Sequence, residues 1–70
     1  MIFELEDDYI ELFKLIKLVN LADSGAEAKI LIEEGQVKRN GEIELRKRAK
    51  ILADETIQIA DDIIEVKSKN

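Results

Sequence analysis

Three pairs of adjacent carboxylates are the residues of this chain whose type and spacing come nearest to a chemical site. Paired carboxylates suit hard cations such as Ca²⁺ and Mg²⁺. The pairs are Asp7-Asp8, Glu33-Glu34 and Asp61-Asp62. None has the ligand spacing of a calcium loop. We therefore interpret them as a helix cap, a solvated helix end and a turn, and we expect no bound metal.

Catalytic side chains are also scarce. The chain has no histidine and no cysteine, so the usual general base near neutral pH and the strongest nucleophile are both absent. Ser24 has no partner base, and Gly35 and Gly41 are too isolated to form a phosphate-binding loop. We expect no enzymatic activity, no cofactor and no small-molecule substrate.

Basic residues are the more informative set. Arg46, Lys47, Arg48 and Lys50 place four cations within five positions, and arginine in particular binds phosphate through two parallel hydrogen bonds. The candidate contacts to a phosphate backbone are Lys17, Lys29, Lys38, Arg39, Arg46, Lys47, Arg48 and Lys50. We expect Arg39 to extend its guanidinium to the surface. A basic run is also common on an ordinary solvated surface, and this alternative stays open.

The charge distribution supports a local site inside an acidic protein. The formal net charge is −5, yet residues 29–50 hold seven cations against four carboxylates, a net charge of +3. The local field decides where a polyanion docks. The acidic flanks are then expected to repel nucleic acid from the other faces.

The segment 24–41 contains the signals that position these cations. Ser24 and Glu27 form a capping box, in which the serine accepts from the N–H of Glu27 and the glutamate reaches the N–H of Ser24 itself. Gly35 ends the resulting helix, and Asn40-Gly41 favours a type I′ turn. The segment therefore predicts a helix, a tight exit and a hairpin.

The remaining elements follow from periodicity. Residues 2–5 suit a short edge strand, and apolar spacing predicts a helix from Tyr9 to about Leu21, with Asp7 or Asp8 as its cap. Strands are expected at 36–39 and 42–45, a basic connector at 46–49, a further short strand at 50–52, and a second hairpin at 56–67 that turns at Asp61-Asp62. We predict one α+β domain over residues 1–70, with a helix–turn–helix pair on a small antiparallel sheet with two hairpins.

The same segment resembles the core signature of the RNA-binding domain named after the fourth protein of the small ribosomal subunit, the S4 (S-four) domain, and most closely its small stand-alone bacterial members. The matching positions are Ser24, Ala28, Leu31, Ile32, Gly35, Val37, Asn40 and Gly41. The likeness extends from Tyr9 to about Val66. It implies an αL-type helix pair that docks structured RNA, ribosomal or transfer RNA, and a role near the ribosome in translation.

Two positions depart from the family pattern. Gly25 stands where many members carry a contacting arginine, and Arg39 stands where the pattern has an inward aliphatic residue. Gly25 and the negative net charge favour an alternative function, a protein-interaction adaptor or homodimer with weak or no RNA affinity.

The aromatic content narrows the kind of RNA. Proteins that bind single strands commonly stack bases on exposed rings. The only aromatic residues are Phe3, Tyr9 and Phe13, and none lies near the basic segment in sequence. We expect Tyr9 and Phe13 in the core, and recognition of structured RNA through phosphates and shape.

The compartment is expected to be the cytoplasm, without a membrane. The absence of cysteine is typical of a reducing setting. No apolar run approaches the roughly 20 residues that span a bilayer. The start of the chain, MIFELEDDY, is acidic where a signal peptide is basic.

Overall fold

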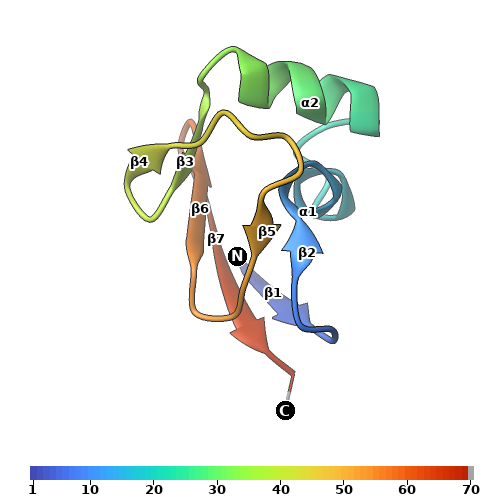
Figure 1. The fold of residues 1–70 in the computed structure, drawn as a ribbon, viewed down its shortest axis with the longest axis vertical. Helices are drawn as coiled ribbons and strands as arrows, with labels where there is room; N and C mark the ends of the chain where they lie inside the picture. Colours follow the sequence, from blue (N-terminus) through green and yellow to red (C-terminus); the bar gives the residue numbers. More distant parts are fainter. Residues whose placement is uncertain (70) are drawn as a thin grey trace.

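The computed structural model describes residues 1–69 and has the predicted α+β class (Figure 1). Its helices are α1 (Leu12–Leu18) and α2 (Gly25–Glu33). Its strands are β1 (Ile2–Leu5), β2 (Ile10–Glu11), β3 (Val37–Arg39), β4 (Glu42–Ile43), β5 (Lys50–Ile51), β6 (Thr56–Ile59) and β7 (Asp62–Ser68). Neither α1 nor α2, which are the helices found within residues 1–69, is long and apolar enough to cross a membrane.

The strands form two sheets. The larger has the order β1-β7-β6-β3-β4, and the smaller pairs β2 with β5. The predicted hairpins β3–β4 and β6–β7 are antiparallel, and β1 is an edge strand as expected. β1 runs parallel to β7, so the larger sheet is mixed. Two parallel strands need a long crossover connection. Here this connection is the whole segment between β1 and β7, which contains both helices and the strands β2 to β6.

The core lies between the helices and one face of the larger sheet. In-register residues share a sheet face, so Val37 and Ile59 point into the core, where both are buried. Alternation along the strand places Lys38, opposite Gln58, on the outer face. The largest fully buried side chains are Leu12, Leu15, Ile16, Ile32, Val37, Ile51, Ile57, Ile64 and Val66.

The ends of α2 confirm the local signals. Ser24 Oγ accepts from the N–H of Glu27 at 3.1 Å. The carboxylate of Glu27 reaches the N–H of Asp23 at 3.4 Å, one residue before the position expected for a capping box. At the other end Gly35 adopts a φ of +75°. The N–H groups of Gly35 and Gln36 donate to the carbonyls of Ile32 and Leu31, which is the Schellman arrangement.

Both hairpins form, and one turn differs from the prediction. Asn40 and Gly41 have φ values of 51° and 88°, as a type I′ turn requires. In the second hairpin Ile59 pairs with Asp62, so the turn is at residues 60–61 and not at Asp61-Asp62. The left-handed residue is Ala60, with a φ of 52°, and alanine carries no turn signal that the sequence would reveal.

The start of the first helix was predicted wrongly. Helix α1 begins at Leu12, because Ile10 and Glu11 form β2 against Lys50 and Ile51 of β5. Neither Asp7 nor Asp8 caps it, and its N-cap residue Glu11 makes no side-chain cap. Tertiary strand pairing overrides the helical periodicity here.

Candidate nucleic-acid interface

The backbone of the connector, residues 46–49, is fixed against the first turn of α1. The N–H of Leu12 donates to the carbonyl of Ala49 at 3.0 Å, and the N–H of Phe13 donates to the carbonyl of Lys47 at 3.1 Å. These N–H groups would otherwise lack a partner at the helix start. The basic connector is therefore held beside α1 by main-chain bonds.

This docking brings cations from three elements around the ring of Phe13. The nitrogen of Lys29 on α2 lies 4.6 Å from the ring centroid. The guanidinium carbon of Arg48 lies at 5.6 Å and the nitrogen of Lys14 on α1 at 5.9 Å. An aromatic face attracts cations through its quadrupole, so the ring gathers charges that otherwise repel one another. We call Phe13, Lys14, Lys29 and Arg48 the Phe13 cluster.

One carboxylate lies against this cluster. Glu11 pairs with Lys14 at 3.0 Å and with Arg48 at 3.6 Å. Three positive charges and one negative charge leave a net charge of +2. Lys29 makes no ion pair with another described residue. Its ammonium group lies over the ring of Phe13 instead.

We expected no aromatic residue near the basic segment, and this is wrong in the folded structure, where two aromatic rings lie close to its cations. Phe13 is partly buried against the core and also contacts three cations. Tyr9 is 43% exposed, and the nitrogen of Lys50 lies 5.0 Å from its ring centroid. No local sequence signal links Phe13 to Lys29 or Arg48, because they lie on separate elements.

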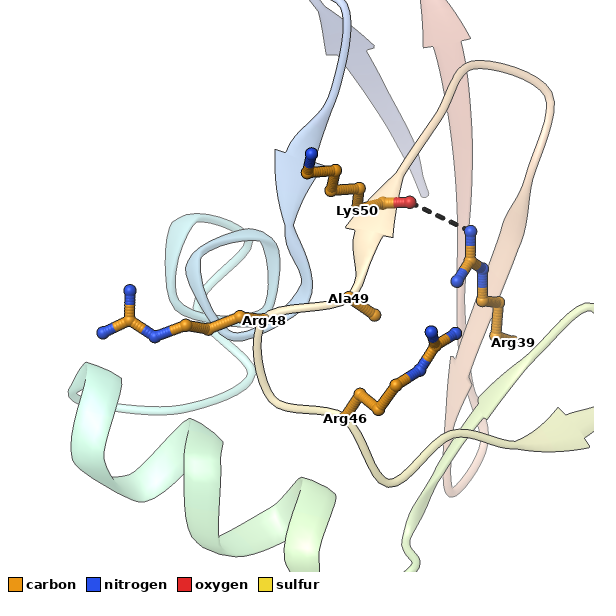
Figure 2. A pocket seen from close by; sticks show the side chains of 5 residues that line it. All are labelled: Arg39, Arg46, Arg48, Ala49 and Lys50. Atoms are coloured by element: carbon orange, nitrogen blue, oxygen red, sulfur yellow. Dashed lines mark hydrogen bonds between the residues drawn. The ribbon is translucent and has the colours of Figure 1, made fainter.

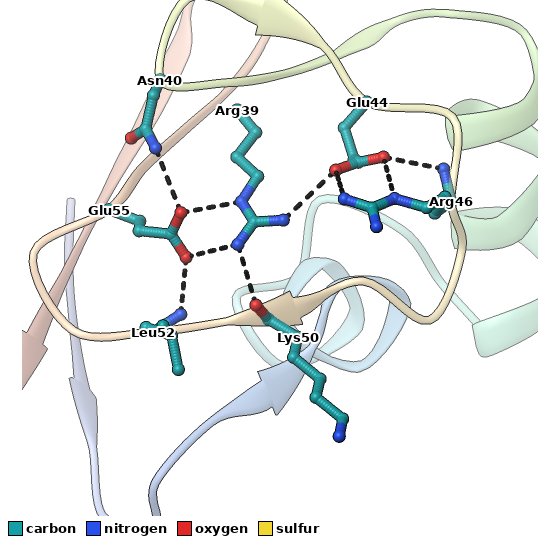
Figure 3. A network of polar contacts seen from close by, with 7 residues as sticks. All are labelled: Arg39, Asn40, Glu44, Arg46, Lys50, Leu52 and Glu55. Carbon is teal, nitrogen blue, oxygen red and sulfur yellow. Dashed lines mark hydrogen bonds and ion pairs between the residues drawn. The ribbon is translucent and has the colours of Figure 1, made fainter.

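Arg39 does not extend to the surface as expected. Its guanidinium donates to both carboxylate oxygens of Glu55, at 2.8 and 2.9 Å, and to Glu44 at 3.3 Å (Figure 3). It also donates to the carbonyl of Lys50 at 2.9 Å. The side chain is only 20% exposed. The hydrogen bonds to Glu55 in particular raise the pKa of Arg39 further, so the charge is permanent and compensated inside the molecule.

Glu44 is the buried charged residue of this network, with 9% of its surface exposed. Arg46 donates to it twice through its guanidinium, at 3.0 Å each, and once through its backbone N–H at 3.1 Å. These bonds, with that from Arg39, lower the pKa of Glu44 to about 2. Glu55 also has a lowered pKa, chiefly through its bonds from Arg39. The two arginines and the two glutamates thus balance in charge.

A shallow hollow of about 500 Å³ lies beside the connector, and Figure 2 shows the residues that line it: Arg39, Arg46, Arg48, Ala49 and Lys50. Their charged ends diverge. Arg48 points toward the helices and belongs to the Phe13 cluster, whereas Arg46 points toward Arg39 and the acidic network. The hollow is therefore basic on the helix side and charge-balanced on the sheet side.

The other predicted contacts have different surroundings. Lys47 forms an ion pair with Glu33 of α2 at 2.6 Å. Lys17 is exposed near the end of α1, and Lys38 is exposed on the outer sheet face. The fold brings Lys29 and Arg48 to the same ring, that of Phe13, and Lys47 against Glu33 of α2. The side chain of Lys50 lies instead over the ring of Tyr9, and Lys38 is on the outer face of the larger sheet.

Comparisons with known proteins agree with this architecture. The family model of the S4 domain matches residues 3–67. The chain is 48% identical over 58 residues to YbcJ of Escherichia coli strain K12, named as a candidate RNA-binding protein, with 83% of each chain covered. The uncharacterised YbcJ of Shigella flexneri matches with the same figures.

A solved structure carries the same fold. The solution structure of YbcJ from E. coli, described as revealing an αL motif involved in RNA binding, superposes with a TM-score of 0.73 at 45% identity. It covers 94% of this chain and 85% of that one. From the matched family model, the sequence identity and the shared fold together, the chain belongs to the S4 domain family.

Proposed function

We propose that this protein is a non-catalytic cytoplasmic module that binds structured RNA of the ribosomal or transfer RNA class. The observation that carries the proposal is the Phe13 cluster, in which cations from α1, α2 and the connector converge on one ring. Together with Glu11, which pairs with two of them, the net charge there is +2. The name of one relative and the description of the solved structure support RNA as the ligand, without naming its class. Phosphates and 2′-hydroxyls of an RNA helix or junction are the groups that such a surface contacts.

The proposed contact surface is centred nearer the helices than the sequence suggested. Lys29 and Arg48 form its centre, and Lys47, Lys50 and Arg46 form its border. Arg39 is assigned a supporting role, because its guanidinium is already bonded to Glu55 and Glu44. Phe13 is a positioning residue, because it fixes the cations without itself carrying charge.

The test is a salt titration of binding to transfer RNA and to a ribosomal RNA junction, measured by fluorescence anisotropy. Replacing Lys29→Gln with Arg48→Gln is expected to weaken binding by roughly tenfold or more and to reduce the salt slope by about 2, since each phosphate contact contributes about 0.9. Lys38→Gln with Lys67→Gln is the matched control, because it removes the same charge from exposed strand positions. An equal loss of RNA affinity in both double variants, or wild-type affinity that does not change with salt concentration, would contradict the proposal.

The positioning role of Phe13 is tested in the same titration. Phe13→Leu keeps an apolar side chain but removes the aromatic face, and it is expected to weaken binding several-fold. Phe13→Tyr keeps the face and is expected to bind as wild type. Thermal unfolding of each variant separates this effect from a loss of fold.

A further inference from the structure

A second surface, mainly acidic, lies along the loop between β1 and β2 and the end of α1. Two adjoining hollows of about 320 and 420 Å³ share Asp7, Tyr9, Ile10 and Leu18 in their walls. We call this continuous feature the Leu18 groove. The loop between β1 and β2, which forms one wall, lies toward the opposite end of the molecule from α2 (Figure 1).

The floor and one wall of the groove are apolar. Leu18 is 61% exposed although it belongs to a helix whose other leucines are fully buried. Tyr9 is 43% exposed, and Phe3 and Ile10 are partly buried against the core. Large apolar side chains that share one concave surface are typical of an interaction site, whereas isolated ones are not.

The rim of the groove is acidic. The segment 4–11 carries five carboxylates and no cation. Within the described residues, Glu6 is paired with Lys69 at 2.8 Å and Glu11 with Lys14 at 3.0 Å. Lys14 itself lines one of the hollows, and Lys50 lies over the ring of Tyr9 at 5.0 Å. Glu4, Asp7 and Asp8 have no ion pair within the described residues. Five carboxylates against Lys14, Lys50 and Lys69 leave the rim with an excess of about two negative charges. Such a rim repels RNA phosphates and attracts cationic side chains.

We propose that the Leu18 groove binds a Lys/Arg-rich segment of another protein, with one aliphatic anchor of that segment seated between Tyr9 and Leu18. The apolar walls supply the anchor site, and the unpaired carboxylates of the rim select the flanking cations. This is the pattern of a central apolar contact inside a polar, charged rim. The groove would thus take a protein partner while RNA is bound at the centre of the basic surface, Lys29 and Arg48.

The test uses a synthetic peptide in which lysine and arginine residues flank one central leucine. Its binding to the ¹⁵N-labelled full chain is followed by NMR, and the same peptide with serine in place of leucine is the control. We expect shifts at Phe3, Tyr9, Ile10 and Leu18, and weaker binding of the serine peptide. Loss of a buried leucine contact corresponds to roughly tenfold in affinity or more.

Matched variants separate the groove from general charge attraction. Leu18→Ser is expected to lower affinity for the leucine peptide by roughly tenfold, whereas Leu45→Ser, which removes a leucine of similar exposure after β4, is expected to leave it unchanged. Asp7→Asn with Asp8→Asn is expected to weaken binding more than Asp61→Asn with Asp62→Asn, which removes the same charge from the second hairpin. RNA affinity is expected to stay at the wild-type value in Leu18→Ser.

Three results would overturn the proposal. Both leucine variants losing equal affinity, or both peptides binding equally, would show that charge alone attracts the peptide. Groove resonances that shift with protein concentration in the absence of peptide would show that a second copy of this chain is the occupant.

Discussion

At the scale of single residues, the chain departs from the family pattern at Arg39, where the pattern has an inward aliphatic residue. The structure shows how an arginine is accommodated there, because Glu55 and Glu44 accept hydrogen bonds from its guanidinium and balance its charge. Strand pairing and the loop before β6 bring these partners together from 16 and 5 positions away in sequence. No local pattern links them, so the sequence alone left Arg39 among the candidate RNA contacts.

The lowered pKa of Glu44 predicts an acid-sensitive contribution to stability. The pKa falls from an ordinary value of 4.5 to about 2 in the folded protein. A group with a depressed folded pKa stabilises the protein above its unfolded pKa, and this contribution is lost as the pH falls toward the folded value. Arg46 is 73% exposed, so solvent screening limits the contribution to about 1–2 kcal/mol.

Urea unfolding of the wild type and of Glu44→Gln measures this contribution. Near pH 7 the variant is expected to be less stable by about 1–2 kcal/mol. The difference should shrink between about pH 4.5 and pH 2 and vanish below. Glu42→Gln, an exposed change on the same hairpin, should track the wild type. A difference independent of pH would show that Glu44 acts through shape and not through its charge.

At the scale of elements, the glycines at the two ends of α2 have different backbone conformations. Gly35 has a φ of +75°, where a Cβ is strained whatever the surrounding space. Gly25 is the first residue of α2 and lacks a positive φ, and a Cβ there would make an ordinary 3.5 Å contact with Phe13. One glycine is required by conformation, and the other is not.

Alanine substitutions at these glycines should therefore change stability in opposite directions. Gly35→Ala is expected to lower the free energy of unfolding by about 1–2 kcal/mol. Gly25→Ala is expected to raise it by about 0.4–1 kcal/mol, mainly by restricting the unfolded chain. Thermal denaturation of the two single variants tests the pair, and a Gly25→Ala protein less stable than wild type would show that the helix start is more crowded than the structure indicates.

The elements that the sequence predicted well are those with a local chemical signal. Ser24, Gly35 and Asn40-Gly41 each satisfy a backbone need within a few residues, so α2 and the first hairpin were predictable. The start of α1 was not, because Ile10 and Glu11 pair with β5 some 40 residues later. The Phe13 cluster was missed for the same reason, since its cations come from three separate elements.

At the scale of the whole molecule, the net charge of −5 is distributed unevenly. Cations gather at the Phe13 cluster and the connector, and carboxylates gather around the Leu18 groove. Glu11 and Lys14 join the two surfaces, because both line the groove and Glu11 also pairs with Lys14 and Arg48 of the cluster. Several connector cations are already paired with carboxylates of the chain, so RNA must compete with these internal partners. The ion pairs hold these cations in place, and they also reduce the positive electrostatic potential that RNA meets at the connector.

Releasing one internal pair should strengthen RNA binding. Glu33→Gln removes the partner of Lys47, 2.6 Å away, and is expected to raise affinity a few-fold and to steepen the salt slope by up to about 0.9. Glu34→Gln removes the same charge from the neighbouring residue, which accepts a hydrogen bond from Gln36. The comparison, made by anisotropy with the same RNA, isolates the ion pair from the change in total charge; equal gains in both variants would assign the effect to net charge.

The parallel pairing of β1 with β7 has a consequence for the order in which the fold assembles. Residues 2–5 pair with residues 65–68, so this pairing joins two strands that lie far apart in sequence. The helices and both hairpins consist of contacts that are much nearer in sequence. Because distant contacts require the closure of a longer loop, we expect the helices and hairpins to form first. Pairing of β1 with β7 is then expected to come late in folding, and it joins the first and last strands of the described fold in a single event.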